Sequence, residues 1–155
     1  MKPSIRRTQA SDLTAVLQLL RAAGLPTADL IGAAGLQLWV LETAGRLVGV
    51  IGLERFGTSA LLRSLCIAPD YQRGGLGQEL VARLEHDAQA DGVERLILLT
   101  ETAQAFFRLL GYEIVDRGYA PEGIKESAEF RSLCPASAVC MTKSLVSPSV
   151  AVLHG

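Results

Sequence analysis

One short segment combines three glycines with two polar residues at a spacing that favours anion binding. It reads Gln72-Arg73-Gly74-Gly75-Leu76-Gly77 and lies between an expected strand and the start of an expected long helix. Glycine lets the backbone turn so that successive N–H groups point the same way, and a helix N-terminus adds partial positive charge. Arg73 brings a full positive charge to the same place. The segment therefore indicates a site for a pyrophosphate or a similar anion.

Two other phosphate-binding loops fit this segment less well. A Walker loop requires Gly-x-x-x-x-Gly-Lys-Ser/Thr, and the sequence contains no such string. A dinucleotide fingerprint follows a strand directly and needs a third glycine, whereas here Leu80 stands at that position and a polar loop over Ala68–Gly75 intervenes. A glycine loop that binds nothing is the structural alternative.

A single charge interrupts the apolar strand expected over Ala60–Ile67. Strict alternation places this residue, Arg63, on the same side as Leu61, Leu65 and Ile67. A buried charge either forms an ion pair or faces a ligand, and both interpretations stay open. As a ligand-binding group, the guanidinium would hold a carboxylate or oxyacid through two hydrogen bonds.

The cysteines and histidines form no recognisable metal or nucleophile motif. Cys66, Cys134 and Cys140 together offer thiols for a trivalent metalloid, but small buried apolar residues are the simpler interpretation. His86 falls within a helix and His154 near the end of the chain, without convergent partners. We expect no metal site.

Length and composition limit the class of protein. The chain has 155 residues, 49% of them hydrophobic, with a net charge of −1. This predicts one folded domain without the basic field that nucleic acid binding requires. No apolar run of about 18 residues is present, so we expect no membrane span. We expect no signal peptide, because no apolar run follows the charges of the first residues, and three cysteines favour a reduced, cytoplasmic protein.

Hydrophobic periodicity and turn residues predict an alternating order of strands and helices. An antiparallel front half joins a β-α-β crossover, which gives an α/β fold with one mixed sheet and helices on both faces over residues 1–144. Residues 145–155 are expected to form a loose tail. The expected elements are strand Ser4–Arg7, a helix capped by Ser11 and closed by Gly24 and Pro26, a short helix Thr27–Ala33, strands Gln37–Glu42, Leu47–Leu53 and Ala60–Ile67, helix Gly77–Ala90, strand Arg95–Thr100, helix Ala103–Leu110, strand Tyr112–Asp116, a helix within Pro121–Phe130 and strand Ala138–Ser144.

Two strings resemble motifs of the GNAT superfamily of acyl-CoA-dependent N-acetyltransferases. Ile67–Gly77 is similar to the family's Gln/Arg-x-x-Gly-x-Gly/Ala loop after a strand. Thr100–Tyr112 is similar to Asn-x-x-Ala-x-x-Phe-Tyr-x-x-x-Gly-Phe/Tyr. The expected element order also matches the family from about residue 4 to residue 144. The resemblance implies a mostly antiparallel mixed sheet with a V-shaped splay, and acetyl-CoA as cosubstrate.

The resemblance also implies roles for individual residues. The main chain of Leu65 and Ile67 would bind the pantetheine arm as an added strand, and the N–H groups near Leu65 would stabilise the oxyanion. The distal part of the arm would pack beside Ala103 and Phe106. The residues that would hold the pyrophosphate are Gln72, Arg73, Gly74, Gly75, Leu76 and Gly77.

The sequence departs from the family pattern at the proton-transfer residues. The family often places a Glu on the strand before the glycine loop, but none occurs there, so Glu54 is the candidate base. A water-mediated path is an equal alternative, and a solvated charge at a strand end is the structural one. Phe107 stands where the family has its acidic Tyr, and a phenyl ring cannot donate a proton. The nearby hydroxyls belong to Thr100, Thr102 and Tyr112.

A narrower resemblance concerns the substrate. Leu61–Leu65 and Ser132–Met141 are similar to an arsenic-resistance branch of GNAT N-acetyltransferases, and Ser132–Met141 is also similar to some amino-acid N-acetyltransferases. This implies a small amino-acid-like amine, such as a glutamate analogue with an arsinic or phosphinic group. Arg63 is the candidate residue to bind its acidic group. Arg131 is a second candidate, for which an exposed loop charge is the favoured alternative. The alternatives are a protein or peptide N-acetyltransferase and a non-catalytic CoA-sensing module. A homodimer is compatible with this fold.

Overall fold

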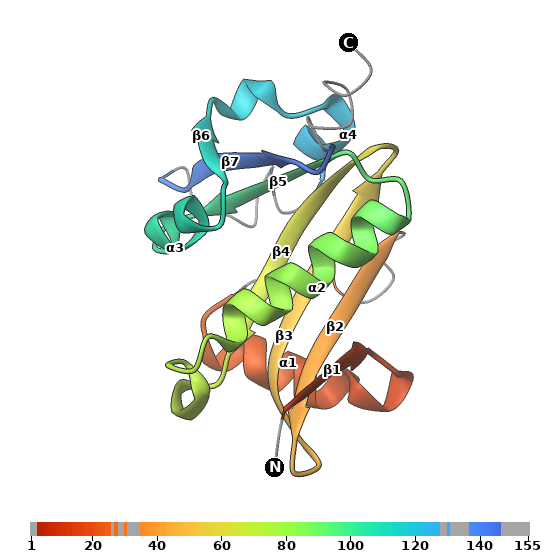
Figure 1. Ribbon diagram of the computed structural model, residues 1–155, viewed down its shortest axis with the longest axis vertical. Helices are drawn as coiled ribbons and strands as arrows, with labels where there is room; N and C mark the ends of the chain where they lie inside the picture. The colour runs from red at the N-terminus through yellow and green to blue at the C-terminus, as the bar shows by residue number, and fades with distance from the viewer. Residues whose placement is uncertain are drawn as a thin grey trace, which may run out of the picture.

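In the computed structural model, residues 3–25, 27, 30, 35–127, 130 and 137–146 are described. Their strands form one seven-stranded sheet in the order β1-β2-β3-β4-β5-β7-β6 (Figure 1). β1 to β4 are antiparallel, β4 and β5 are parallel, and β7 pairs antiparallel with both β5 and β6. The strands are β1 (Ser4–Arg7), β2 (Leu36–Thr43), β3 (Arg46–Phe56), β4 (Ser59–Ile67), β5 (Arg95–Thr100), β6 (Glu113–Val115) and β7 (Val139–Ser144).

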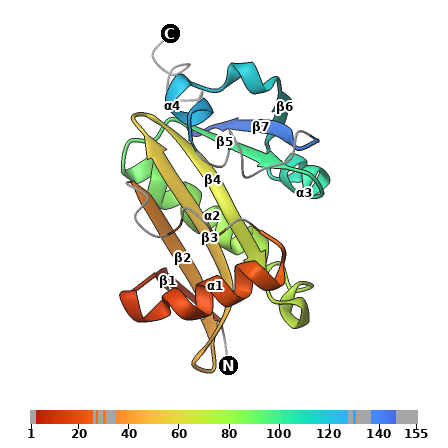
Figure 2. The same ribbon diagram turned by 180° about the vertical axis from the view of Figure 1, so that it is seen from behind.

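Two helices cover opposite faces of the antiparallel half of the sheet. These are α1 (Leu13–Ala22) and α2 (Leu76–Ala90). The other described α-helices are α3 (Gln104–Leu109) and α4 (Glu122–Lys125). Figure 1 shows α2 lying across β2 to β4, and Figure 2, from behind, shows α1 crossing the other face. Leu80 and Leu84 of α2 are buried against Trp39 and Leu53, whereas Val16 of α1 belongs to the core cluster of the opposite face. The mixed sheet with helices on both faces is as predicted.

The predicted element order agrees with the described structure, with two local differences. Ser11 is not the helix cap, because it lies inside a 3-10 turn (Ala10–Asp12) and Asp12 occupies the cap position of α1. Within the helix expected over Pro121–Phe130, α4 covers Glu122–Lys125 and ends there, and residues 128 and 129 lie outside the described part of the chain. Most of the helix expected over Thr27–Ala33 lies outside the described residues.

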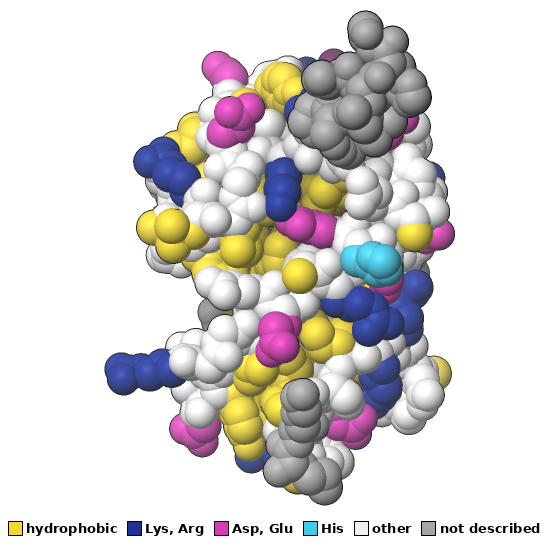
Figure 3. Space-filling model, in the orientation of Figure 1, with side chains coloured by type: hydrophobic (Ala, Val, Ile, Leu, Met, Phe, Trp, Pro, Cys, Tyr) yellow, Lys and Arg dark blue, Asp and Glu magenta, His cyan; other side chains and the backbone are white. Residues whose placement is uncertain are grey.

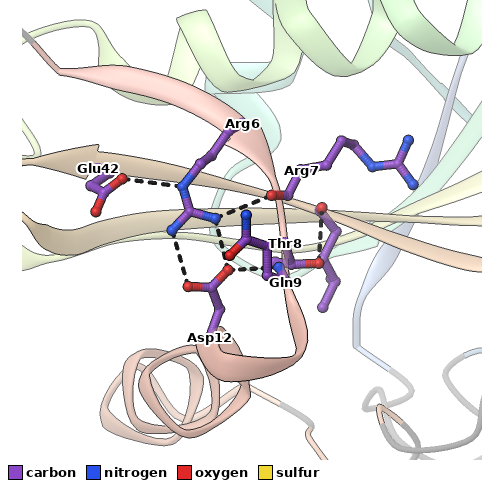
Figure 4. Close-up of polar contacts among 7 residues, drawn as sticks. Arg6, Arg7, Thr8, Gln9, Asp12 and Glu42 are labelled. Atoms are coloured by element: carbon purple, nitrogen blue, oxygen red, sulfur yellow. Dashed lines mark hydrogen bonds and ion pairs between the residues drawn. The ribbon is translucent and has the colours of Figure 1, made fainter.

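Arg6 joins β1 to β2 and to the start of α1 (Figure 4). Its Nε donates to Glu42 Oε1 at 3.1 Å, and its Nη1 and Nη2 donate to the Asp12 carboxylate at 2.8 and 3.0 Å. The Gln9 backbone N–H also donates to Asp12 Oδ2, at 2.7 Å. These contacts, led by the Arg6 hydrogen bond, lower the pKa of Asp12 to about 2. The cluster holds the first helix in position against the sheet edge.

The packed structure continues one residue past the predicted end of the domain. Leu145 is buried, its N–H donates to the Glu94 carbonyl at 2.8 Å, and its carbonyl accepts from Gln89 Nε2 at 2.6 Å. Residues 147–155 of the expected tail are outside the described part of the chain. None of the described helices is long and apolar enough to cross a membrane.

Candidate active site

The parallel strands β4 and β5 pair only at their starts. Their register covers Ser59↔Arg95, Ala60↔Leu96 and Leu61↔Ile97, and beyond these positions the two strands diverge (Figure 1). A cleft of about 160 Å³ opens between them. It is lined by residues 62–65 of β4, residues 98–100 of β5, and Leu25, Thr102, Ala103 and Phe107. The V-shaped splay expected from the resemblance is therefore present.

A β-bulge in β4 shapes one wall of this cleft. Val50 pairs with Cys66 but Gly52 pairs with Arg63, so two residues of β4 lie opposite one residue of β3. Ser64, one of the two, has a φ of 62°, which few residues other than glycine adopt. The bulge reverses the alternation of side chains along β4.

The reversed alternation corrects one prediction. Leu62, before the bulge, and Leu65 and Ile67, after it, all pack toward the core cluster beneath α2. Arg63 therefore does not share a face with Leu65 and Ile67, as strict alternation predicted. Ser64 was not identified from the sequence as a site residue, because a serine in an apolar strand gives no signal that a bulge occurs there.

Main-chain N–H groups of β4 face the cleft. The Ala68 N–H donates to the Val48 carbonyl of β3 at 2.8 Å. Because successive N–H groups of a strand point to opposite edges, those of Ile67 and Leu65 point away from β3 and toward the splay. This is the geometry that the proposed pantetheine contact requires. The Ile67 carbonyl already accepts a hydrogen bond from Gln72 Nε2 at 3.0 Å.

The glycine loop leads directly into the N-terminus of α2. Gly75 occupies the cap position with a φ of 76°, and the Glu79 N–H makes the first helical hydrogen bond, to the Gly75 carbonyl at 3.1 Å. The N–H groups of the first helical residues thus have no partner within the helix and are oriented for an anion. A Cβ on Gly77 would lie 3.4 Å from Phe106 Cζ, so glycine permits this close packing of α2 on α3.

The predicted phosphate-binding residues lie along this loop, and one of them, Gln72, has its side chain hydrogen-bonded to β4. Residues 72–75 are exposed, and Leu76 and Gly77 are half-buried. The Gln72 side chain donates a hydrogen bond to the Ile67 carbonyl and so connects the loop to the end of β4.

Figure 3, which views the α2 face, shows hydrophobic side chains gathered between α3 and α2. Phe106 and Leu76 are among the half-buried residues that pack against the core there.

The two charged candidates, Arg63 and Glu54, contact each other. Arg63 is 2% exposed, and its Nη1 lies 3.4 Å from Glu54 Oε1. Its Nε donates to Ser64 Oγ at 3.3 Å. Arg63 therefore forms an ion pair and also lines the cleft. The ion-pair interpretation is confirmed, and the ligand-binding interpretation stays a prediction. Glu54 is buried behind Arg63 and is not among the residues that line the cleft.

The hydroxyl groups near Phe107 differ in what they can reach. Phe107 is buried and lines the cleft, where the family pattern has its Tyr. Tyr112 is buried outside the lining, and its hydroxyl donates to Glu85 Oε2 at 2.8 Å. Burial and the Glu85 charge raise the pKa of Tyr112 far above its usual value. Thr100 Oγ1 accepts from the Ala103 N–H at 3.0 Å, and Thr102 and Ser64 are the other hydroxyl residues of the lining.

The thiols do not converge in the part of the chain that the structure describes. Cys66 and Cys140 are buried in separate core clusters. Burial raises the pKa of both thiols, that of Cys140 to about 11. No group of three metal-ligating side chains occurs among the described residues. Cys134 and the predicted substrate residue Arg131 lie outside them.

Comparison with known proteins shows the family. The sequence pattern of the acetyltransferase (GNAT) domain matches residues 34–114, which is more than half of the chain. The chain belongs to the GNAT acetyltransferase family. The matched segment contains β2 to β5, the glycine loop, α2 and α3, and so includes both walls of the cleft.

Amino-acid acetyltransferases are among the relatives of this GNAT domain. One from Ectopseudomonas mendocina is 35% identical over 79 residues, which are 50% of this chain and 18% of the relative. The chain thus spans less than a fifth of the length of that protein.

Solved structures confirm the fold. N-acetylglutamate synthase from Neisseria gonorrhoeae, complexed with coenzyme A and N-acetyl-glutamate, superimposes with a TM-score of 0.80 at 21% identity, over 95% of this chain and 36% of that one. Rv2747 from Mycobacterium tuberculosis, in complex with CoA and NLQ, gives 0.79 at 23% identity, over 92% and 99%. At these identities the likeness establishes the GNAT fold.

Proposed function

We propose that the protein is an acetyl-CoA-dependent N-acetyltransferase that acetylates the primary amine of a small, acidic, amino-acid-like molecule. The observation that carries this proposal is the cleft where β4 and β5 separate. It presents unpaired strand edges to an extended ligand, and the glycine loop and the start of α2 follow directly from β4. A thioester arm and its diphosphate would occupy these two neighbouring features.

In this proposal, β4 positions the acetyl group. The main-chain groups of Leu65 and Ile67 would bind the pantetheine amides, as a strand pairs with a sheet edge. The Leu65 N–H would also stabilise the oxyanion that forms when the thioester is attacked. The residues that would bind the diphosphate are Gln72, Arg73, Gly74, Gly75, Leu76 and Gly77, and Ala103 and Phe106 would lie beside the distal arm.

The amine would attack the carbonyl carbon directly, and binding both reactants in line would supply much of the rate. Amines are mostly protonated near neutral pH, so a base must remove a proton. Glu54 is the nearest candidate carboxylate on β3, with Arg63 between it and the cleft. A water molecule between the amine and Glu54 would complete such a path.

Arg63 supports an acidic substrate. It is the charged side chain of the described cleft lining, and its buried position fixes the guanidinium. The names of the relatives, amino-acid acetyltransferase and N-acetylglutamate synthase, fit an amine that carries a carboxylate. A glutamate analogue with an arsinic or phosphinic group is the finer proposal, with Arg131 as a second anion-binding residue.

The test is an amine panel with acetyl-CoA, monitored by thiol release and by the mass of the product. We expect amine-dependent thiol release that is greatest for glutamate-like oxyacids. Glutamate, its phosphinic and arsinic analogues, and their decarboxylated amines separate the coarse proposal from the finer one. Release with peptides but not with amino acids would favour a protein N-acetyltransferase.

One observation favours a different function, a CoA-binding module without catalysis. Phe107 lines the cleft where the family has a proton donor, and a phenyl ring donates none. Such a module would bind acetyl-CoA but release no thiol with any amine. The same panel therefore decides between the two functions.

A further inference from the structure

The β4 bulge places a strained hydroxyl residue in the cleft. Ser64 has a φ of 62°, and among the described residues only one other non-glycine residue, Ala44 in the β2–β3 turn, has a positive φ. A left-handed backbone is unfavourable for a serine, and such strain persists where the surrounding structure imposes it, often at functional sites. Ser64 is half-buried and lines the wall that the proposed thioester would contact.

The Ser64 hydroxyl is oriented by its neighbour. Arg63 Nε donates to Ser64 Oγ at 3.3 Å, so one lone pair of this oxygen is engaged by a cation. Within the part of the chain that the structure describes, the Ser64 proton has no assigned acceptor, which leaves it available to the cleft. A cationic donor on Oγ also strengthens the hydrogen bond that this hydroxyl can donate, because the two bonds polarise each other.

The opposite wall lacks a donor at the usual place. Phe107 is 4% exposed and lines the cleft with a side chain that has no hydrogen-bond donor. Tyr112 is bound to Glu85. Thr100 accepts from the Ala103 N–H, and Thr102 is exposed. Of the three hydroxyl residues in the lining, Ser64 alone is held by a charged group.

We propose that Ser64 Oγ–H donates a hydrogen bond to the leaving sulfur and so replaces the donor that Phe107 lacks. This inference rests on the proposed acetyl transfer. The amine nitrogen bonds to the carbonyl carbon, the C–S bond breaks, and the sulfur leaves with the electron pair. The hydrogen bond stabilises the developing thiolate without transferring the serine proton. The proton lost by the amine passes through the proposed water path to Glu54 and from there to solvent, and the thiolate is protonated from solvent after release.

Ser64→Gly tests the proposal without disturbing the bulge, because glycine adopts a φ of 62° freely. We expect kcat with acetyl-CoA to fall about 100-fold, the usual effect of removing one donor from developing charge. The Kd for acetyl-CoA and the melting temperature should not worsen. Ser64→Asn, which tolerates the same backbone and retains an N–H donor, should recover part of the loss. A kcat for Ser64→Gly within about 3-fold of wild type would overturn the proposal.

Leaving-group dependence distinguishes this role from any other effect of Ser64. Thiolates of acidic thiols leave readily and need little help. The defect of Ser64→Gly should therefore be large with S-acetyl-N-acetylcysteamine and should nearly vanish with an acetyl nitrothiophenol thioester. An equal defect with both donors would contradict the proposal.

A rescue variant uses the opposite wall. Phe107→Tyr in the Ser64→Gly background would return a hydroxyl to the cleft and should raise kcat again. The absence of any amine-dependent turnover by the wild-type protein would contradict the proposed function itself. That result would be known before any variant is compared, so the two failures are distinguishable.

Discussion

The described residues that line the cleft include one charged side chain, three hydroxyl residues and an apolar remainder. A mostly apolar site with few polar groups binds through its surface area and selects through its polar contacts. Specificity should therefore depend on Arg63, and proton transfer on the groups that contact it. Each of these residues can be changed conservatively.

Arg63→Lys keeps the positive charge beside Glu54 but removes the planar fork of donors. We expect the KM for an acidic amine to rise about 10-fold, since one bidentate contact is replaced by a point charge. The KM for an amine without an acidic group, measured in the same assay, serves as the control. An unchanged KM for the acidic amine would eliminate the clamp role.

Glu54→Gln retains an oxygen that can accept from Arg63 Nη1, so the side-chain geometry is kept. If Glu54 accepts the amine proton, kcat should fall about 100-fold near neutral pH and recover in alkaline solution, where the free amine predominates. The measurement is kcat from about pH 6 to about pH 9. Full activity across this range would show that the proton leaves by a different path.

At the scale of elements, the junction of β4 with α2 combines a strand edge and a helix N-terminus. Gly75 begins the helix with a left-handed backbone, and a Cβ there would meet only Gln78 Oε1, at 3.8 Å. The space beside Gly75 is thus open to a ligand. The same junction should be sensitive to added negative charge.

Gly75→Glu should weaken acetyl-CoA binding at least about 10-fold, because a carboxylate would repel the diphosphate and the φ of 76° disfavours any side chain. Gly57→Glu, in the β3–β4 turn, is the matched control, since Gly57 has a similar φ of 69° and a Cβ there would meet nothing within 4 Å. Calorimetric titration measures both. Equal affinity for acetyl-CoA in the two variants would show that the diphosphate binds elsewhere.

The Arg6 cluster predicts how stability depends on pH. The pKa of Asp12 is lowered from 3.8 to about 2 in the folded protein, so the unfolded chain binds the proton more tightly. This contribution is present above about pH 4 and is lost as the pH falls toward 2. Asp12→Asn should melt at a lower temperature at neutral pH, and the difference from wild type should shrink in acid. A constant difference down to pH 2 would contradict the assignment.

The sequence predicts the helices and strands better than it predicts irregular features such as the β-bulge and the order of strands in the sheet. Periodicity located β5 and α2 to within a residue, because buried faces repeat regularly along these elements. The placement of β7 between β5 and β6 depends on long-range pairing, which local patterns do not encode. The bulge at Ser64 could not be predicted from the sequence either, and without it strict alternation placed Arg63 on the wrong face of β4 relative to Leu65 and Ile67. The contact of Arg63 with Glu54 depends on the register between β3 and β4. From the sequence, an ion pair of Arg63 was one of two interpretations, and its partner could not be named.

At the scale of the whole molecule, one sheet divides into two parts at the cleft. β1 to β4 pack with α1 and α2, while β5 to β7 lie with α3 and α4 (Figures 1 and 2). The two parts remain joined where β4 and β5 pair, at Ser59–Leu61 and residues 95–97. A ligand that bridges the splay would pair with both parts. Binding should therefore stabilise the folded protein by mass action.

The central claim is that this cleft and the glycine loop bind acetyl-CoA, and calorimetric titration of the purified protein tests it most directly. We predict saturable binding of about one acetyl-CoA per chain, weakened in Gly75→Glu and retained in Gly57→Glu. No binding at millimolar acetyl-CoA would contradict the transferase and the CoA-binding module together.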